Sequence, residues 1–473
     1  MKQQPSIWIA ALGGVGALSL LFALSHRPEA RAERPAEVKE ATYAPKAKGT
    51  ITYTRDIAPI LFANCSGCHR PGEVAPFPLL AYQDAQKRAA QLATVTQSKY
   101  MPPWKPDTRF STFKDTHILT AEQIGTLKQW AEEGAKEGNP KDLPAAPKFA
   151  AGWTIGAPDA IFEPAKDYPL TAEGSDVYRC FVVPTSYTED RYISTIDVRP
   201  GNRAVVHHLI AYLDTSGKAR QMEAASSDGL PGFTAFGGLG FAAAGTLGGW
   251  APGSMPHPLP EGVGILLPKG ADIVLQVHYH KSGKPETDRT KIGVYFCKGP
   301  VDKRARMAAI TSRGLRIPAD EANYEAAGSQ EIKNDITVLQ VAPHMHLIGH
   351  DMTVTATLPG GDKKPLIRIP DWDFNWQGFY TLQDPLKLPG GSTVNMVAHF
   401  DNSTRNPRNP NSPPKRVTWG EQTTNEMCIA FALYTVDSEH LTKGIVGDNS
   451  NGEFGRRGAR LQRLRQLLGG NRR

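Results

Sequence analysis

The stretch APHMHLIGH, residues Ala342 to His350, has the alternating pattern of a β-strand and carries two histidines that are two residues apart. In an extended strand, successive side chains point to opposite faces, so His344 and His346 are expected on the same face. Two imidazoles on one face can bind a single metal ion. The alternative is a pair of partly buried histidines that are satisfied by hydrogen bonds.

Two further segments with β-like patterns carry histidines. RAVVHHLIAYLD contains His207 and His208, and ADIVLQVHYHKSG contains His278 and His280. Neighbours on a regular strand face opposite ways, so His207 and His208 can bind one metal only if the strand is bulged or ends there. Between these segments the chain has short alternating runs and abundant Gly (45) and Pro (38). This pattern predicts a mainly β region of antiparallel sandwiches.

Length and charge limit the possible organisation. With 473 residues the chain is too long for one ordinary domain, and its hydrophobic (40%) and charged (21%) fractions are those of a globular protein. The formal net charge is +7, much of it in a basic tail at 441–473. This tail is expected to be a solvated, frayed helix, with contact to an anionic membrane or a partner as the alternative. No nucleic-acid motif occurs, and no nucleic-acid partner is expected.

The N-terminus has the pattern of an export signal. Lys2 precedes an apolar run from Ile7 to Ser25. Residues 1–32 are therefore predicted to be a signal peptide or, because the run is longer than most signal-peptide cores, a membrane anchor. Residues 33–50, rich in Pro, Ala and mixed charge, are predicted to be a linker. The remainder of the chain is expected outside the cytoplasm: periplasmic, secreted, or anchored to the outer face of the cytoplasmic membrane.

The segment NCSGCHRPG contains the C-x-x-C-H pattern of covalent c-type haem attachment, formed by Cys65, Cys68 and His69. Two thiols bond the haem vinyl groups while the histidine binds the iron. The export signal favours this interpretation over a chance match or a redox C-x-x-C pair. Met101 in SKYMPPWKPD is the favoured second axial ligand, and His117 is the alternative.

A helix is expected to close this haem module. LTAEQIGTLKQWAEEGAKEG begins with a threonine that can cap a helix, and Ile124, Leu127 and Trp130 follow at helical spacing. Residues 51–143 are therefore predicted to form a small α-helical domain like cytochrome c, with one covalently attached haem c.

A candidate thioether ligand is Met427, in the final apolar strand TTNEMCIAFALY. Imidazole suits zinc, copper, iron or nickel, and a nearby thioether favours copper, particularly Cu(I). On spacing alone, a methionine in such a strand is normally part of the core. A zinc hydrolase is disfavoured because no H-E-x-x-H motif occurs.

From about residue 150 to 440 the chain resembles the copper type II, ascorbate-dependent monooxygenases, the family of peptidylglycine α-hydroxylating monooxygenase and dopamine β-monooxygenase. The matching stretches are VVHHLIAY, GWAPG with LPEGVGILLPKG, LQVHYH, HMHLIGH and NEMC, in the family's order. The resemblance implies two consecutive jelly-roll-like sandwiches, at 150–300 and 301–440, with one of two copper ions on each. It implies as ligands of the electron-donating copper His207, His208 and His278. It implies as ligands of the oxygen-binding, catalytic copper His344, His346 and Met427.

The sequence also departs from the family. Where the peptidylglycine enzyme holds its substrate carboxylate with an arginine and a tyrosine, this chain has Ala342 and Phe431, so a peptidylglycine substrate is not expected. The resemblance implies a disulfide between Cys180 and Cys297, which leaves Cys428 unpaired. Four aromatic residues of DWDFNWQGFY are expected in the core, with an apolar pocket as the alternative: Trp372, Phe374, Trp376 and Tyr380.

Together these features predict an oxidoreductase, a copper-dependent monooxygenase that hydroxylates a C–H bond of a small organic substrate with O2. Its electrons are expected from a periplasmic donor through the fused haem, or from ascorbate. The alternative is a non-enzymatic extracytoplasmic protein that binds copper and haem and transfers electrons. An open coordination position beside Met427 and a substrate pocket would distinguish the two.

Overall fold

The computed structural model describes residues 42–73, 75–149, 152–235 and 238–447. The predicted leader, the first half of the predicted linker and most of the basic tail lie outside these ranges. In the part of the chain that is described, no helix is long and apolar enough to cross a membrane.

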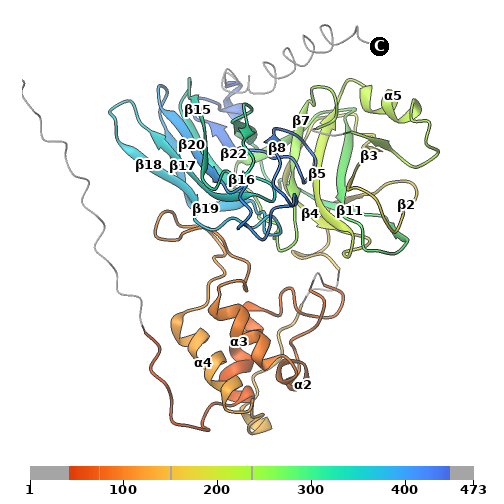
Figure 1. Ribbon diagram of the computed structural model, residues 1–473. Coiled ribbons are helices and arrows are strands. Elements are labelled where there is room, and N and C mark those ends of the chain that lie inside the picture. The colour runs from red at the N-terminus through yellow and green to blue at the C-terminus, as the bar shows by residue number, and fades with distance from the viewer. Residues whose placement is uncertain (1–41, 74, 150–151, 236–237, 448–473) are drawn as a thin grey trace, which may run out of the picture. The chain divides into compact units, whose positions relative to one another are not determined.

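The N-terminal part of the described chain is helical (Figure 1). Its core contains Leu61, Leu127 and Trp130, all at most 1% exposed. The short helical turns are η1 (Tyr53–Ile57) and η2 (Pro140–Asp142). The α-helices are α1 (Ala58–Asn64), α2 (Tyr82–Gln86), α3 (Ala89–Gln97) and α4 (Ala121–Glu132).

Helix α4 begins where the sequence predicts. The Thr120 hydroxyl accepts from the Gln123 amide while the Gln123 side chain accepts from the Thr120 amide, which is a capping box. Gly125 lets the ring of Tyr43 lie directly on the helix, since a Cβ there would overlap the ring. Tyr43 also donates to Gln129 at 2.5 Å. The end of the predicted linker therefore packs on α4.

The next part of the chain is a sandwich of two five-stranded sheets (Figure 1). One sheet has the order β1 (Ala160–Phe162), β11 (Lys291–Phe296), β4 (Arg191–Arg199), β8 (Val263–Leu267) and β12 (Lys303–Arg304). The other has the order β6 (Phe233–Thr234), β3 (Val177–Pro184), β9 (Asp272–Tyr279), β5 (Val206–Asp214) and β7 (Gly245–Trp250). A two-stranded ribbon, β2 (Tyr168–Leu170) with β10 (Glu286–Asp288), and helix α5 (Lys218–Ala224) complete this part.

The second sandwich has two four-stranded sheets. One has the order β13 (Arg306–Thr311), β22 (Ile429–Val436), β16 (Ile336–His344) and β19 (Tyr380–Leu388). The other has the order β15 (Tyr324–Glu331), β20 (Thr393–Phe400), β17 (Gly349–Thr357) and β18 (Lys363–Ile369). The short pair β14 (Arg316–Ile317) with β21 (Val417–Thr418) and the turn η3 (Leu441–Lys443) lie outside these sheets.

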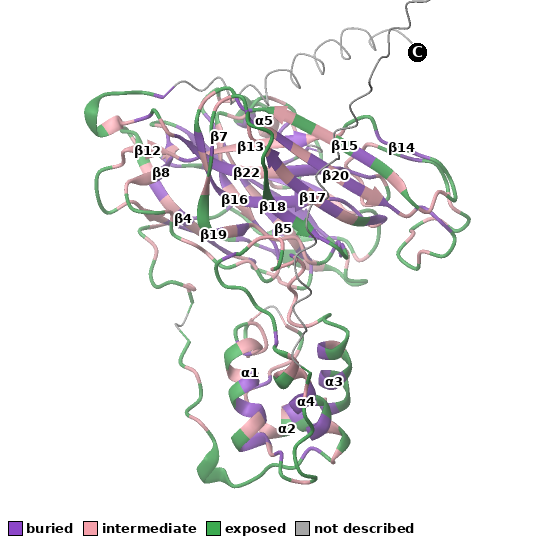
Figure 2. Ribbon diagram, turned by 90° about the vertical axis from the view of Figure 1, so that its left-hand side faces the viewer, coloured by how far each residue is buried: buried purple, intermediate pink, exposed green. Residues whose placement is uncertain are grey.

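Each sandwich has its own apolar core, and buried residues follow its strands (Figure 2). Leu433 of β22 packs into the core cluster of the first sandwich, so the two cores are in contact. Apart from the parallel pair β8 and β12, the described strand pairs are antiparallel. The predicted β-rich region is confirmed.

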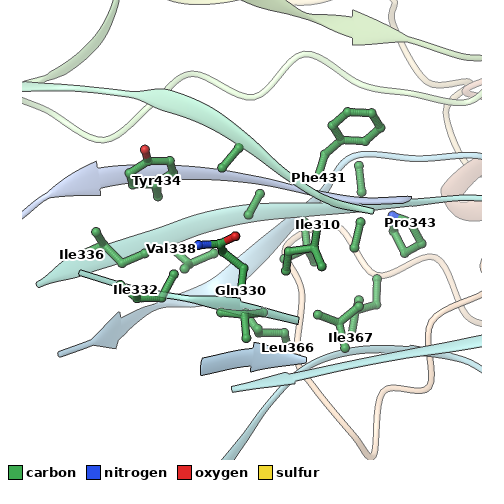
Figure 3. Close-up of a pocket in the computed structure, with 17 residues that line it drawn as sticks. Ile310, Gln330, Ile332, Ile336, Val338, Pro343, Leu366, Ile367, Phe431 and Tyr434 are labelled. Atoms are coloured by element: carbon green, nitrogen blue, oxygen red, sulfur yellow. The ribbon is translucent and has the colours of Figure 1, made fainter. Parts of the chain in front are cut away.

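A small cavity of about 40 Å³ lies inside the second sandwich. Figure 3 shows the apolar side chains of Ile310, Val338 and Leu366 around it, with Gln330 among them. None of the predicted copper ligands, all of which the structure describes, lines it. It is a packing void of the core.

The predicted disulfide between Cys180 and Cys297 is absent from the structure, in which both cysteines are free. Along β3, Phe181 points into the core between the sheets, so Cys180 faces the other way, with its sulfur 3.8 Å from Gln276 Nε2. Cys297 follows β11 of the other sheet, and its sulfur lies 3.5 Å from the Val263 carbonyl. The prediction is wrong because the two side chains belong to different sheets and Cys180 points away from the second one.

Candidate metal centre

Three predicted ligands of the first copper converge in the structure. His207 Nδ1 lies 3.1 Å from His208 Nδ1, which lies 3.4 Å from His278 Nδ1. One ligand atom from each residue falls within 4.8 Å of the others. The cause is local: the pairing of β5 with β9 is bulged between Val206 and His208, and His208 stands opposite His278. The bulge that adjacent histidines require is confirmed.

The chemistry of this set fits a metal ion. His278 Nε2 lies 3.0 Å from the Asp176 carboxylate, which fixes the proton on Nε2 and leaves the Nδ1 lone pair for the metal. Burial lowers the pKa of His207 to about 3 and the pKa of His208 well below its usual value, so both rings are neutral at pH 7. Neutral imidazole nitrogens this close repel one another through their lone pairs unless a proton or a cation lies between them.

The second predicted set comes from the end of β16 and the segment before β22. The rings of His344 and His346 are 5.2 Å apart at 87°. His344 is the last residue of its strand and His346 lies just beyond it, so strand alternation alone does not set their relation. Met427 is buried and lies in the same cavity as both histidines.

Hydrogen bonds orient both rings of this set. Gln377 Oε1 lies 2.5 Å from His344 Nδ1, and the Asn425 carbonyl lies 3.1 Å from His346 Nδ1. Each contact leaves the Nε2 atom of the histidine available to a metal. Burial lowers the pKa of His344 to about 4 and that of His346 to about 3, so both are neutral ligands at pH 7.

The fully buried Glu426 holds the backbone around the second set. Its carboxylate accepts from the amides of His346 and Ile348, each at 2.8 Å, and from its neighbour Met427 at 3.2 Å. Burial raises the pKa of Glu426 to about 8, against the lowering effect of these amide donors. One side chain thus ties the H-x-H turn to the segment before β22 that carries Met427.

Phe374 contacts a ring from each histidine set. It stacks on His207 with ring centroids 4.7 Å apart at 15°, and it meets His346 edge-on at 5.8 Å. Trp372 is buried in the core of the second sandwich and donates to the His346 carbonyl at 3.0 Å. Of the four aromatic residues singled out in DWDFNWQGFY, Trp372, Phe374 and Tyr380 are buried and Trp376 is half-buried. None of the four lines the large cavity described next, but Phe379 of the same run does.

This large cavity, of about 820 Å³, connects the two sets. It is lined by His208 of the first set and by His344, His346 and Met427 of the second. Apolar and polar groups share the rest of its wall, among them Trp250, Ile429, Phe431, Arg313, Glu421 and Gln377.

The C-x-x-C-H segment forms a compact turn after α1. The amide of His69 donates to the Cys65 carbonyl at 2.8 Å, and His69 Nδ1 lies 3.0 Å from the Phe77 carbonyl. The histidine therefore keeps Nε2 for a metal, as a haem ligand would. Cys65 and Cys68 are free thiols, which fits covalent haem attachment.

The two candidates for the second axial ligand lie beyond α3. The Met101 amide donates to the Val95 carbonyl at 3.0 Å. The His117 ring lies edge-on to Trp104 at 6.3 Å. The axial role of Met101 stays a prediction.

Sequence reasoning missed four residues that orient the ligands: Asp176, Gln377, Thr423 and Glu426. Only Glu426 had a usable signal, because it stands beside the methionine in NEMC. Asp176 and Gln377 come from distant segments, 102 and 33 residues from the histidines that they contact. Thr423 acts through Asp176, to which its hydroxyl donates at 2.7 Å.

The fold and these residues define a class: a two-sandwich β protein with two histidine sets on one cavity. Residues 306–444 match the family model of the C-terminal domain of copper type II ascorbate-dependent monooxygenases. This match covers the second sandwich with His344, His346 and Met427. It supports the copper type II monooxygenase family and implies copper as the metal.

Curated relatives agree over limited stretches. DBH-like monooxygenase protein 1 of Gallus gallus is 30% identical over 115 residues, which is 24% of this chain and 17% of that protein. The protein of the same name from Homo sapiens is 24% identical over 182 residues, 34% of this chain and 28% of that protein. The chain thus spans less than a third of the length of these relatives.

Solved structures add nothing to the assignment. The major capsid protein P2 from bacteriophage PM2 covers 59% of this chain and 97% of its own at 9% identity, but with a TM-score of 0.22. A likeness this low carries no argument.

Proposed function

We propose that this protein is a copper-dependent monooxygenase that hydroxylates a C–H bond of a small organic substrate. The overall reaction takes R–H, O2, two electrons and two protons to R–OH and water. The observation that carries the proposal is the cavity of about 820 Å³ that holds side chains of both histidine sets. A substrate in this cavity lies beside His344, His346 and Met427 of the second set. It also lies on the wall to which His208 of the first set contributes.

The residues of the chain divide the work between the two sets. His207, His208 and His278 are proposed to hold one copper, and His344, His346 and Met427 the other, the site of catalysis. Bound copper supplies one-electron chemistry with dioxygen. Gln377 orients the ring of His344, and Glu426 holds the backbone of His346 and Met427 in place. The buried walls limit the access of water to the reacting position.

We propose that the substrate is not held through a carboxylate of its own at the two positions where the peptidylglycine enzyme has an arginine and a tyrosine. Ala342 and Phe431 both line the cavity and neither can pair with a carboxylate. The wall carries the charged groups Arg313 and Glu421 instead. Burial raises the pKa of Glu421 to about 7, against the lowering effect of Arg313.

Electrons are proposed to come from a periplasmic donor through a haem c bound by Cys65, Cys68 and His69, with Met101 as the second axial ligand. The hydrogen bond from His69 Nδ1 to the Phe77 carbonyl supports the axial role of His69. The protein is proposed to work outside the cytoplasm, where c-type haem is attached. Turnover of Met101→Ala with a reduced cytochrome as donor tests the relay, and unchanged turnover would defeat it.

The test of the function is copper content and substrate-dependent O2 uptake with ascorbate as reductant. We expect two coppers per chain and incorporation of one atom of ¹⁸O2 into a product of a small-molecule library. Met427→Leu keeps the volume but removes the thioether, and should lower turnover about 10–100-fold. Met255→Leu, at a residue 48% exposed and outside the cavity wall, is the matched control.

The rival is an electron-transfer or copper-binding protein without an organic substrate. It predicts two bound coppers, reversible reduction, and no substrate that stimulates O2 uptake. In that case Met427→Leu would shift the copper potential and change no turnover.

A further inference from the structure

Glu73 lies at the centre of a cluster of three arginines. Its Oε1 accepts from Arg70 at 2.7 Å and from Arg199 at 3.3 Å, and its Oε2 accepts from Arg203 at 2.8 Å. Arg70 belongs to the same segment as Glu73. Arg199 and Arg203 belong to the first sandwich, at the end of β4 and in the turn before β5.

These contacts are shielded from solvent. The side chains of Glu73, Arg199 and Arg203 are 16%, 13% and 22% exposed. Arg199 is fixed further by Thr154, whose hydroxyl accepts from it at 2.9 Å, and by Asp197 at 3.5 Å. Partly buried pairs with fixed partners are screened less by salt than exposed ones.

The members of the cluster lie close in sequence to two predicted metal-binding segments. Glu73 is four residues after His69 of the C-x-x-C-H motif, and Arg203 is four residues before His207. The contact therefore joins the predicted haem segment to the turn that leads into β5, the strand that carries His207 and His208. The second set has a different neighbour, since Tyr100 meets Trp376 edge-on at 6.1 Å, next to the Gln377 that orients His344.

We infer that Glu73 is a positioning residue that docks the C-x-x-C-H segment on the turn before β5, so that electrons pass from the haem to the three-histidine copper. This rests on the proposed function. In the step, one electron leaves a ferrous haem and reduces one cupric ion, which gives a ferric haem and a cuprous ion without proton transfer. A one-electron reductant such as a reduced cytochrome restores the ferrous haem.

The test uses the full chain with Glu73→Gln, which removes the charge and keeps the shape. Glu122→Gln is the matched control, because Glu122 lies on the same helical part but pairs at 3.4 Å with Lys46 of that part. The first readout is hydrogen–deuterium exchange of the backbone at 199–206, which needs neither haem nor copper. The second is the rate at which the haem is re-oxidised after a sub-stoichiometric amount of reduced cytochrome is mixed anaerobically with the full chain, whose histidine sites have been loaded with cupric ion and freed of excess copper.

We expect Glu73→Gln to raise exchange at 199–206 and to slow haem oxidation by about tenfold, the effect of losing a partly buried charged pair. The haem potential should stay unchanged, and Glu73→Asp should restore part of the rate. Glu122→Gln should match the wild type in both readouts. Unchanged haem oxidation in Glu73→Gln would overturn the inference, whatever the exchange at 199–206.

Failure of the proposed function gives a different result. If no substrate supports O2 uptake but Glu73→Gln still slows haem oxidation, the docking role of Glu73 is supported and the proposed monooxygenase function is rejected. If substrate is hydroxylated and Glu73→Gln leaves haem oxidation unchanged, the function stands and the docking role falls.

Discussion

Asp176→Asn should weaken copper binding at the three-histidine set alone. The Asp176 carboxylate accepts from His278 Nε2 at 3.0 Å and from the Thr423 hydroxyl at 2.7 Å, and these contacts hold its pKa below the usual range although burial raises it. An asparagine has one carbonyl oxygen and no charge, so the proton of His278 is no longer fixed on Nε2. Rings that carry the proton on Nδ1 cannot use that atom for the metal. Loss of such a carboxylate costs about 10–100-fold in metal affinity, about 1.4–2.8 kcal/mol.

The assay is competition between the protein and a chromogenic chelator for copper, with EPR of the oxidised form to assign each site. Thr423→Val removes one hydrogen bond and keeps the charge, so its loss should be smaller. Asp159→Asn is the control, because Asp159 pairs at 2.6 Å with the exposed Lys298, beside the other sheet of the first sandwich. Equal affinities of Asp176→Asn and wild type at the first set would refute the reasoning.

Three other outcomes are expected from the structure. Gln377→Leu should lower copper affinity at the His344 set about tenfold in the same chelator assay, because it removes the group that orients that ring. Glu439→Gln should flatten the acid side of the stability curve in calorimetry: although burial raises its pKa, two arginines hold the pKa of Glu439 at about 2, so its contribution is present above about pH 4.5 and is lost as pH falls toward 2. A thiol titration of the denatured protein should find both Cys180 and Cys297 reactive without reductant, whereas a disulfide would hide both.

Short local spacing marked the histidine pairs as metal candidates, whereas only the resemblance to the copper monooxygenases selected His278 and Met427 as ligands. The adjacent His207 and His208 demanded an irregular strand, and β5 is bulged there. The pairing of β5 with β9 then placed His278 opposite His208, which no local pattern could specify. Which strands pair is a property of the folded sheet.

Two kinds of error have physical causes. The Cys180–Cys297 pair failed because family order says nothing about which face of β3 a residue occupies, and a strand exposes alternate residues to opposite sides. The orienting groups Asp176 and Gln377 were missed because a carboxylate or amide that fixes a histidine proton can come from any segment that passes nearby.

The segment from Thr423 to Met427 explains why the two sets need one folded unit. Thr423 holds Asp176, which orients His278 of the first set. Two residues later, the Asn425 carbonyl orients His346, and Met427 comes next but one as a proposed ligand of the second set. A five-residue loop of the second sandwich therefore fixes ligands on both sandwiches. Because the same backbone carries both sets of contacts, a change that moves this loop affects both sets, whereas loss of the Asp176 charge acts on the first set through His278.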